Sequence, residues 1–195
     1  LVPVQALYPL VEKLAEQTDT RLRLRAEVLA GSWECLEDGR ADLLISSLNP
    51  DIMLTGIKHQ PLQEEVMLYV AHPDHPLHLE PEPLADETLR RYRAIAIADT
   101  ARRKPALTYR LLDKQPRLTV STMGEKRDAL LAGIGVGTMP LSWIEEDIKA
   151  ARLKVIGPEY RHQVQVVLAW RRDTMGKAKS WLVREIPKLF PCKGE

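Results

Sequence analysis

The sequence predicts an α/β fold, because segments with helical spacing alternate with short apolar segments along the chain. Leu7, Leu10, Val11 and Leu14 recur at the spacing of an amphipathic helix. Residues 43–45 instead form a continuous apolar run, which is typical of a strand covered on both faces. This alternation indicates a mainly parallel sheet whose strands are connected by helices.

The predicted elements follow one another over the whole chain. Residues 21–28 alternate between apolar and charged side chains, and therefore predict a half-buried strand. The other expected strands cover residues 41–46, 65–71, 93–98, 118–121, 136–139 and 163–170. After the first helix, further helices are expected to begin near Ser32, Thr122 and Ser142, and a last helix carries Ala178, Trp181 and Leu182 on one face.

Three of these helices carry capping signals at their first residues. Ser32 precedes a short helix that Gly39 would end. Thr122 with Glu125 has the spacing of a capping box, and so does Ser142 with Glu145. We therefore expect the side chains of Ser32, Thr122 and Ser142 to bind backbone amides.

Length and charge limit the class of protein. The 195 residues suffice for one domain or two small lobes, and the proline-rich stretch 72–83 suggests a boundary between lobes. Lysine and arginine number 28 against 27 acidic residues, so the formal net charge is only +1. This balance argues against a general nucleic-acid-binding surface.

Cysteine use and hydropathy indicate a protein of a reducing compartment. Cys35 and Cys192 lie far apart and outside any CxxC pair, although a disulfide between them stays an open alternative. No apolar run approaches the roughly 20 residues of a membrane helix, and no signal segment opens the chain. Because the chain starts at Leu1 without a methionine, we expect it to be a piece of a longer protein.

Four motifs occur in a fixed order along the chain. They are residues 36–45 (LEDGRADLLI), 61–77 (PLQEEVMLYVAHPDHPL), 132–140 (AGIGVGTMP) and 164–170 (VQVVLAW). Each motif alone is weak, but the ordered set resembles the effector-binding domain of LysR-type transcriptional regulators. The strand that opens this family domain, and the helix-turn-helix DNA-binding domain before it, are absent from the sequence.

This resemblance implies a fold of two Rossmann-like lobes, like that of type 2 periplasmic binding proteins, joined by two crossover segments. Lobe I would comprise residues 1–71 with 164–195, and lobe II residues 72–163. Members of the family bind a small metabolite in the cleft between the lobes. The strand ends and helix starts that would face such a ligand are Gly31, Ser32, Ser46, Ser47, Asp99, Thr100, Thr122, Met123, Gly137 and Thr138. The competing interpretation is that these residues are caps and turns.

The resemblance also implies partners. Two such domains would pair antiparallel, the helix at residues 7–14 of one against the helix after Thr122 of the other. The interface residues expected from this pairing are Leu7, Leu10, Leu14, Lys126 and Leu130. The full-length regulator would be a cytoplasmic tetramer that binds promoter DNA, with RNA polymerase as a further partner and no membrane or cofactor.

Several patterns suggest other chemistry but support it weakly. Residues 102–104 and 161–162 are basic and could favour an anionic effector, yet such runs are usually solvated. The histidines at 72, 75 and 78 are interrupted by prolines, which disfavours a metal site. The glycines at 133, 135 and 137 lie between a helix and a strand, the reverse of the dinucleotide-binding order.

Two other functions remain open from the sequence. A periplasmic solute-binding protein of a transporter would share the fold, and an upstream signal peptide rather than a helix-turn-helix would identify it. An enzyme on the same fold would need converging acid, base or nucleophilic groups, and no such motif is visible. We therefore favour the regulator over both.

Overall fold

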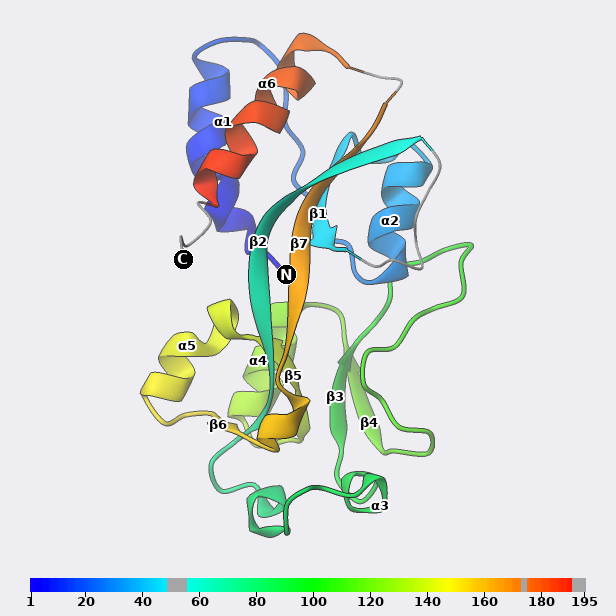
Figure 1. Ribbon diagram of the computed structural model, residues 1–195, viewed down its shortest axis with the longest axis vertical. Helices are drawn as coiled ribbons and strands as arrows, with labels where there is room; N and C mark the ends of the chain where they lie inside the picture. The colour runs from blue at the N-terminus through cyan, green and yellow to red at the C-terminus, as the bar shows by residue number, and fades with distance from the viewer. Residues whose placement is uncertain (49–55, 173–174, 191–195) are drawn as a thin grey trace. The chain divides into compact units, whose positions relative to one another are not determined.

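A computed structural model describes residues 1–48, 56–172 and 175–190 (Figure 1). The chain forms two compact units. Unit 1 comprises Leu1–Glu64, Thr100–Ala106 and Val164–Glu195, and unit 2 comprises Glu65–Asp99 and Leu107–Gln163. Two long strands, β2 (Ile57–Ala71) and β7 (His162–Arg171), contribute residues to both units.

Unit 1 is built on strands β1 and β7 and the first part of β2. Strand β1 (Leu43–Ser47) pairs antiparallel with β7, Leu43 opposite Trp170 and Ser47 opposite Val166. The helical elements of unit 1 are η1 (Val4–Leu7), α1 (Tyr8–Ala15), α2 (Ala30–Glu37), α6 (Lys177–Glu185) and η5 (Ile186–Leu189).

The core of unit 1 joins α1 and α6 to the strands. Leu10 and Leu14 of α1 lie in one buried cluster with Leu168 of β7 and Leu182 of α6. A second cluster packs Trp33 and Leu36 of α2 with Val167 and Ala169, which alternate with Leu168 along β7. The helical spacing of α1 and the period of two along β7 thus place apolar side chains on the two faces of this sheet.

Unit 2 contains the remaining strands and helices. Strands β3 (Ala94–Ile97) and β4 (Arg117–Val120) run parallel, as do β3 and β5 (Val136–Pro140), whereas β2 pairs antiparallel with β5 and with β6 (Lys154–Val155). The helical elements are η3 (Pro76–Leu79), α3 (Asp86–Leu89), α4 (Met123–Leu131), α5 (Leu141–Lys149) and η4 (Pro158–Tyr160).

Two apolar clusters form the core of unit 2. Leu130 of α4 and Ile144 of α5 lie in the cluster that contains Ile95 and Met139 of the strands. Tyr69 and Val136 belong to the other cluster, with leucines of the segment between β2 and β3. Because Val136 and Met139 are three residues apart, they point to opposite faces of β5.

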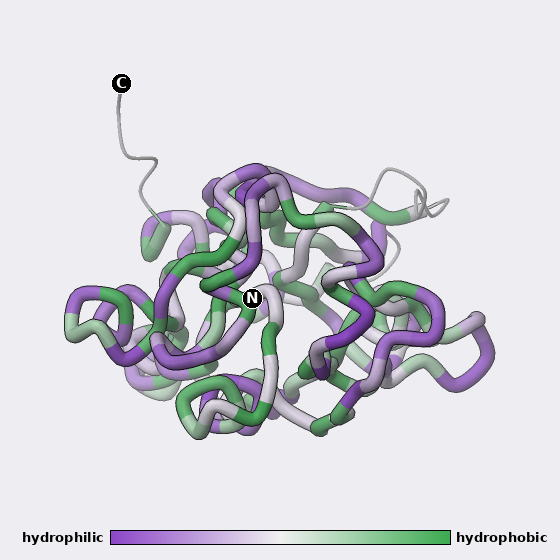
Figure 2. Tube along the Cα trace, turned by 90° about the horizontal axis from the view of Figure 1, so that it is seen from below, coloured by the Kyte–Doolittle hydropathy of each residue, from purple (hydrophilic) through white to green (hydrophobic). Residues whose placement is uncertain are grey.

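Hydrophobic residues are distributed in short stretches. The trace in Figure 2 changes between hydrophilic and hydrophobic residues every few positions. Within the described residues, no helix has the length and apolar character needed to cross a membrane.

The structure corrects several expectations about single elements. Residues 21–28 are not a strand, and Leu24 is exposed. The second helix begins at Ala30, so that Ser32 lies inside its first turn and its N-cap is Leu29. Helix α5 begins at Leu141 with Pro140 at its N-cap, so Ser142 lies inside the first turn, where its hydroxyl donates to Glu65 Oε2 at 2.6 Å. The capping box of Thr122 and Glu125 is confirmed.

The sheet is mixed rather than mainly parallel. Antiparallel pairing joins β7 to β1, and β2 to both β5 and β6. An apolar run indicates a buried strand but does not identify the neighbour with which it pairs, so the direction could not be inferred from the sequence.

The bounds of the units also differ from those of the predicted lobes. The first division falls after Glu64, inside β2, rather than after Ala71 at the start of the proline-rich stretch. Residues Thr100–Ala106 belong to unit 1, although they lie within the predicted lobe II. The second division, before Val164, coincides with the predicted one.

Candidate functional site

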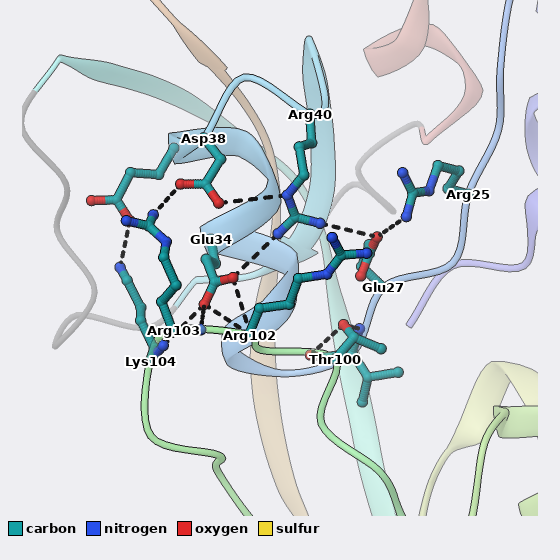
Figure 3. Close-up of polar contacts among 11 residues, drawn as sticks. Arg25, Glu27, Glu34, Asp38, Arg40, Thr100, Arg102, Arg103 and Lys104 are labelled. Carbon is teal, nitrogen blue, oxygen red and sulfur yellow. Dashed lines mark hydrogen bonds and ion pairs between the residues drawn. The ribbon is translucent and has the colours of Figure 1, made fainter.

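The predicted ligand residues Gly31 and Thr100 are in contact in unit 1. A Cβ added at Gly31 would lie 2.2 Å from Thr100 Oγ1 and 2.4 Å from the Thr100 carbonyl carbon. Thr100 Oγ1 also accepts a hydrogen bond from the Val28 N–H at 2.9 Å (Figure 3). Glycine at position 31 therefore lets Thr100 pack on the first turn of α2. Ser32, next in that turn, is buried.

A buried carboxylate on α2 holds the residues that follow Thr100. Glu34 has no exposed surface, and its two oxygens accept the N–H groups of Arg102, Arg103 and Lys104 at 3.0–3.1 Å. Arg40 adds an ion pair at 3.3 Å (Figure 3). The amides of Arg103 and Lys104 lower the pKa of Glu34 to about 2, against the effect of burial, and the Arg102 amide acts in the same direction.

The basic side chains of this segment are largely neutralised by acids of α2 and its C-terminal end. Arg103 pairs with Asp38, and Lys104 Nζ lies 2.7 Å from Glu37 Oε2. Their backbone amides are occupied by Glu34. The structure therefore favours an anchoring role for Arg103 and Lys104 over the binding of an anionic effector.

Ser46 and Ser47 end β1 and are half-buried. They lie opposite Val167 and Val166 of β7. Neither hydroxyl has a hydrogen-bond partner among the residues that the structure describes. These two side chains are therefore available for a ligand in a way that a capping serine is not.

In unit 2, three of the predicted ligand residues have structural roles. The Asp99 carboxylate accepts the Leu107 N–H at 2.7 Å, and so joins the two ends of the segment between them. Thr122 Oγ1 accepts the Glu125 N–H at 3.1 Å, while Glu125 Oε2 accepts the Thr122 N–H at 2.9 Å. Met123 packs against the apolar cluster of α4 and α5. Turn formation, capping and core packing account for these contacts.

Gly137 and Thr138 of β5 are both buried. Thr138 Oγ1 is a buried side-chain atom without a hydrogen-bond partner in the described part of the chain. A Cβ added at Gly137 would lie 2.9 Å from Lys126 Cε and 3.4 Å from Lys126 Nζ. Because neighbouring strand residues face opposite sides of a sheet, Lys126 and Thr138 lie on different faces of β5.

The predicted interface residues pack largely inside the chain itself. Leu10 and Leu14 are 3% and 2% exposed, and Leu130 is fully buried. Leu7 packs against the same cluster as Leu10. Their side chains therefore contribute to the cores of the two units, and only the outer faces of α1 and α4 remain for a partner.

Lys126, also predicted at the interface, lies on the face of α4 that is turned to β5 and is 8% exposed. Burial lowers its pKa to about 8. A signal for this position is present in the sequence, because residues 126, 129 and 130 share one face of a helix and the other two are apolar.

The three neighbouring histidines take part in their own turn. His72 Nδ1 and His75 Nδ1 accept the N–H groups of Asp74 and Leu77, and His78 Nε2 lies 3.1 Å from the His72 carbonyl oxygen. In the part of the chain that is described, no group of three or more His, Cys, Asp or Glu side chains is arranged to hold a metal ion.

Comparison with known proteins identifies relatives over nearly the whole chain. The family model described as "LysR substrate binding domain" matches residues 2–190. "Probable HTH-type transcriptional regulator YhaJ" of Escherichia coli (strain K12) is 54% identical over 196 residues, a match that covers 99% of this chain. The chain spans 65% of the length of that relative.

Solved structures agree on the fold. Full-length LTTR LysG from Corynebacterium glutamicum, with bound effector Arg, gives a TM-score of 0.69 at 15% identity, covering 95% of this chain and 63% of LysG. The regulatory domain of AphB in Vibrio vulnificus gives 0.63 at 14% identity, covering 93% of this chain and 89% of that one.

Proposed function

The chain belongs to the LysR family of transcriptional regulators, and we propose that it senses a small-molecule effector and passes that signal to DNA binding. The match to the family's substrate-binding domain over residues 2–190 is the observation that carries this proposal. The effector Arg in the related LysG structure supports it, because that fold holds a small molecule. The full-length protein would act in the cytoplasm on promoter DNA.

The residues expected to contact a ligand occur in each of the two units. In unit 1 the free hydroxyls of Ser46 and Ser47 and the packed pair Gly31–Thr100 favour this role. In unit 2 Gly137 and the unpartnered hydroxyl of Thr138 favour it. An effector can shift such a regulator only by binding one of its conformations more tightly than another.

Regulators of this family are not enzymes, and the comparisons give no support to a transporter component. The relative YhaJ is named as a transcriptional regulator, and both structural neighbours are LysR-type regulatory proteins. For this chain, binding without chemical conversion is therefore the expected outcome of any ligand encounter.

A thermal-shift screen against a metabolite panel tests the proposal. An effector stabilises the chain by mass action, by about 2.7 kcal/mol at a hundredfold excess over its Kd. The same compound must then change the affinity of the full-length regulator for its promoter. A compound that stabilises the chain but leaves DNA binding unchanged at saturation would contradict the signalling role.

Self-association is proposed through the outer faces of α1 and α4. Tyr8 of α1 is 53% exposed, so its ring is free to contact a second copy of the chain. Tyr8→Glu should shift the chain toward monomer in sedimentation velocity, while Glu145→Gln, an exposed change on α5, should not. Charged residues at Leu10 or Leu14 would instead unfold unit 1, so they do not test the interface.

A further inference from the structure

Lys126 is a buried cation whose position depends on a glycine in the facing strand. It lies on the fourth residue of α4 and is 8% exposed. Any side chain at Gly137 would begin 2.9 Å from Lys126 Cε, a separation too short for two carbon atoms. The absence of a side chain at Gly137 therefore provides the space through which the lysine extends along β5.

The ammonium group of Lys126 has no acidic partner within the described residues. No hydrogen bond or ion pair to its side chain occurs there. The neighbouring acid Glu125 is occupied by the N–H groups of Ser121 and Thr122, at 2.7 and 2.9 Å. Arg127, the next cation along the helix, is paired with Asp147. Among the described residues, Lys126 is thus a buried cation of unit 2 without a compensating acid.

Lys126 is not fully enclosed, since 8% of its surface stays exposed. Within the described residues its ammonium group has no hydrogen-bond or ion-pair partner. A buried, unpaired ammonium is costly, and proteins ordinarily compensate such a charge with a carboxylate. Here the compensating group can come from outside the chain.

We propose that Lys126 receives the carboxylate of a small organic acid, and that Gly137 keeps its path open. This inference rests on the proposed sensing function and adds the chemical class of the effector. A single cation suits a singly charged carboxylate better than a phosphate or sulfate, which usually takes two or more charged donors. The Thr122 capping box occupies the nearest helix terminus, so the lysine is the principal donor.

The test uses paired probes and paired variants. Thermal unfolding of the 195-residue chain is measured with a panel of aliphatic and aromatic monocarboxylates, with the amide of each acid, and with sodium chloride at equal ionic strength. The variants are Lys126→Met and, as a control, Lys149→Met on the exposed face of α5. Lys126→Gln, neutral but hydrogen-bonding, takes the place of the methionine variant if the latter does not fold.

We expect at least one carboxylate to raise the Tm of the wild type and of Lys149→Met while its amide does not. In Lys126→Met, binding should be about ten to a hundred times weaker, as for loss of one charge-assisted hydrogen bond. An equal Tm gain in Lys126→Met would overturn the inference, as would a panel in which no carboxylate exceeds its amide. A neutral compound that binds wild type and Lys126→Met alike would leave sensing intact and exclude the carboxylate. If no compound of any class binds, sensing itself is contradicted.

Discussion

The Glu34 side chain binds a segment that is distant in sequence and holds it in unit 1. It accepts amides of residues 68 to 70 positions further along the chain, so it fixes Thr100–Ala106 on α2. A carboxylate that receives several N–H groups is stabilised in its charged form, which is why its pKa falls to about 2. The anchoring is therefore tied to the ionised state of Glu34.

A pH titration tests this anchor. The ordinary pKa of Glu34 is 4.5, so the unfolded chain binds a proton more readily than the folded one between pH 4.5 and about 2. Its contribution to stability is complete above pH 4.5 and is lost as the pH falls through this window. Glu34→Gln should lower the Tm at pH 7 and should flatten its decline below pH 4.5. Glu16→Gln, an exposed change in the same unit, should keep the wild-type profile; an unchanged slope in Glu34→Gln would refute the anchor.

Gly31 offers a steric test of the same region. Its replacement by alanine places a Cβ 2.4 Å from the Thr100 backbone, which must move. We expect a loss of about 1–3 kcal/mol in the free energy of unfolding, as for overpacked cores. Gly124→Ala is the matched control, because its Cβ would meet nothing closer than 3.8 Å and alanine favours the helix by about 0.5–1 kcal/mol. Equal effects of both changes, measured by urea unfolding, would mean that the close approach at Gly31 does not matter.

At the scale of elements, local signals were readable from the sequence and long-range ones were not. The Thr122 capping box needs only residues three apart, so it was predictable. The role of Ser142 was not, because Glu65, which accepts its hydroxyl, lies 77 residues away. Burial of Lys126 follows from helical spacing, whereas the glycine that makes room for it lies on another element.

For the candidate site, too, the sequence predicted one part and not the other. Small polar residues after strands were identifiable, but the sequence did not indicate which hydroxyls were already used. Thr122 is engaged in its cap, while Ser46 and Ser47 remain free in the described residues. Hydrogen-bond partners depend on the fold, so the hydroxyl groups that remain free could not be inferred from the sequence.

The cap of α4 gives a prediction for a single element. Thr122→Ala removes the acceptor of the Glu125 N–H and half of the capping box. The free energy of unfolding should fall by about 1 kcal/mol, the usual effect of losing an N-cap side chain. Ser121→Ala, one residue earlier and without a side-chain hydrogen bond among the described residues, should change it little. Chemical denaturation gives the free energy of unfolding of both variants. Equal values for Thr122→Ala and Ser121→Ala would show that the Thr122 cap does not stabilise the protein.

For the molecule as a whole, the chain path couples the two units. The chain passes between them after Glu64, Asp99, Ala106 and Gln163, and neither unit is one continuous segment. Strand β2 supplies Leu62 to the core of unit 1 and Leu68 to a core of unit 2. If β2 detached from one unit during unfolding, the other unit would therefore lose residues of its own core.

We accordingly expect the two units to unfold in one cooperative transition. Trp33, Trp170 and Trp181 belong to unit 1, and Trp143 belongs to unit 2. A variant that keeps Trp33 as its single tryptophan therefore follows unit 1, and a variant that keeps Trp143 alone follows unit 2. Leu14→Ala, which opens a cavity in unit 1, should cost about 2–5 kcal/mol. If the units unfold together, it lowers the midpoint seen by both tryptophans equally, because a two-state transition has one midpoint for all probes. A Trp143 midpoint that stays at the wild-type value while that of Trp33 falls would show that unit 2 is stable alone, and that strand continuity does not couple the units.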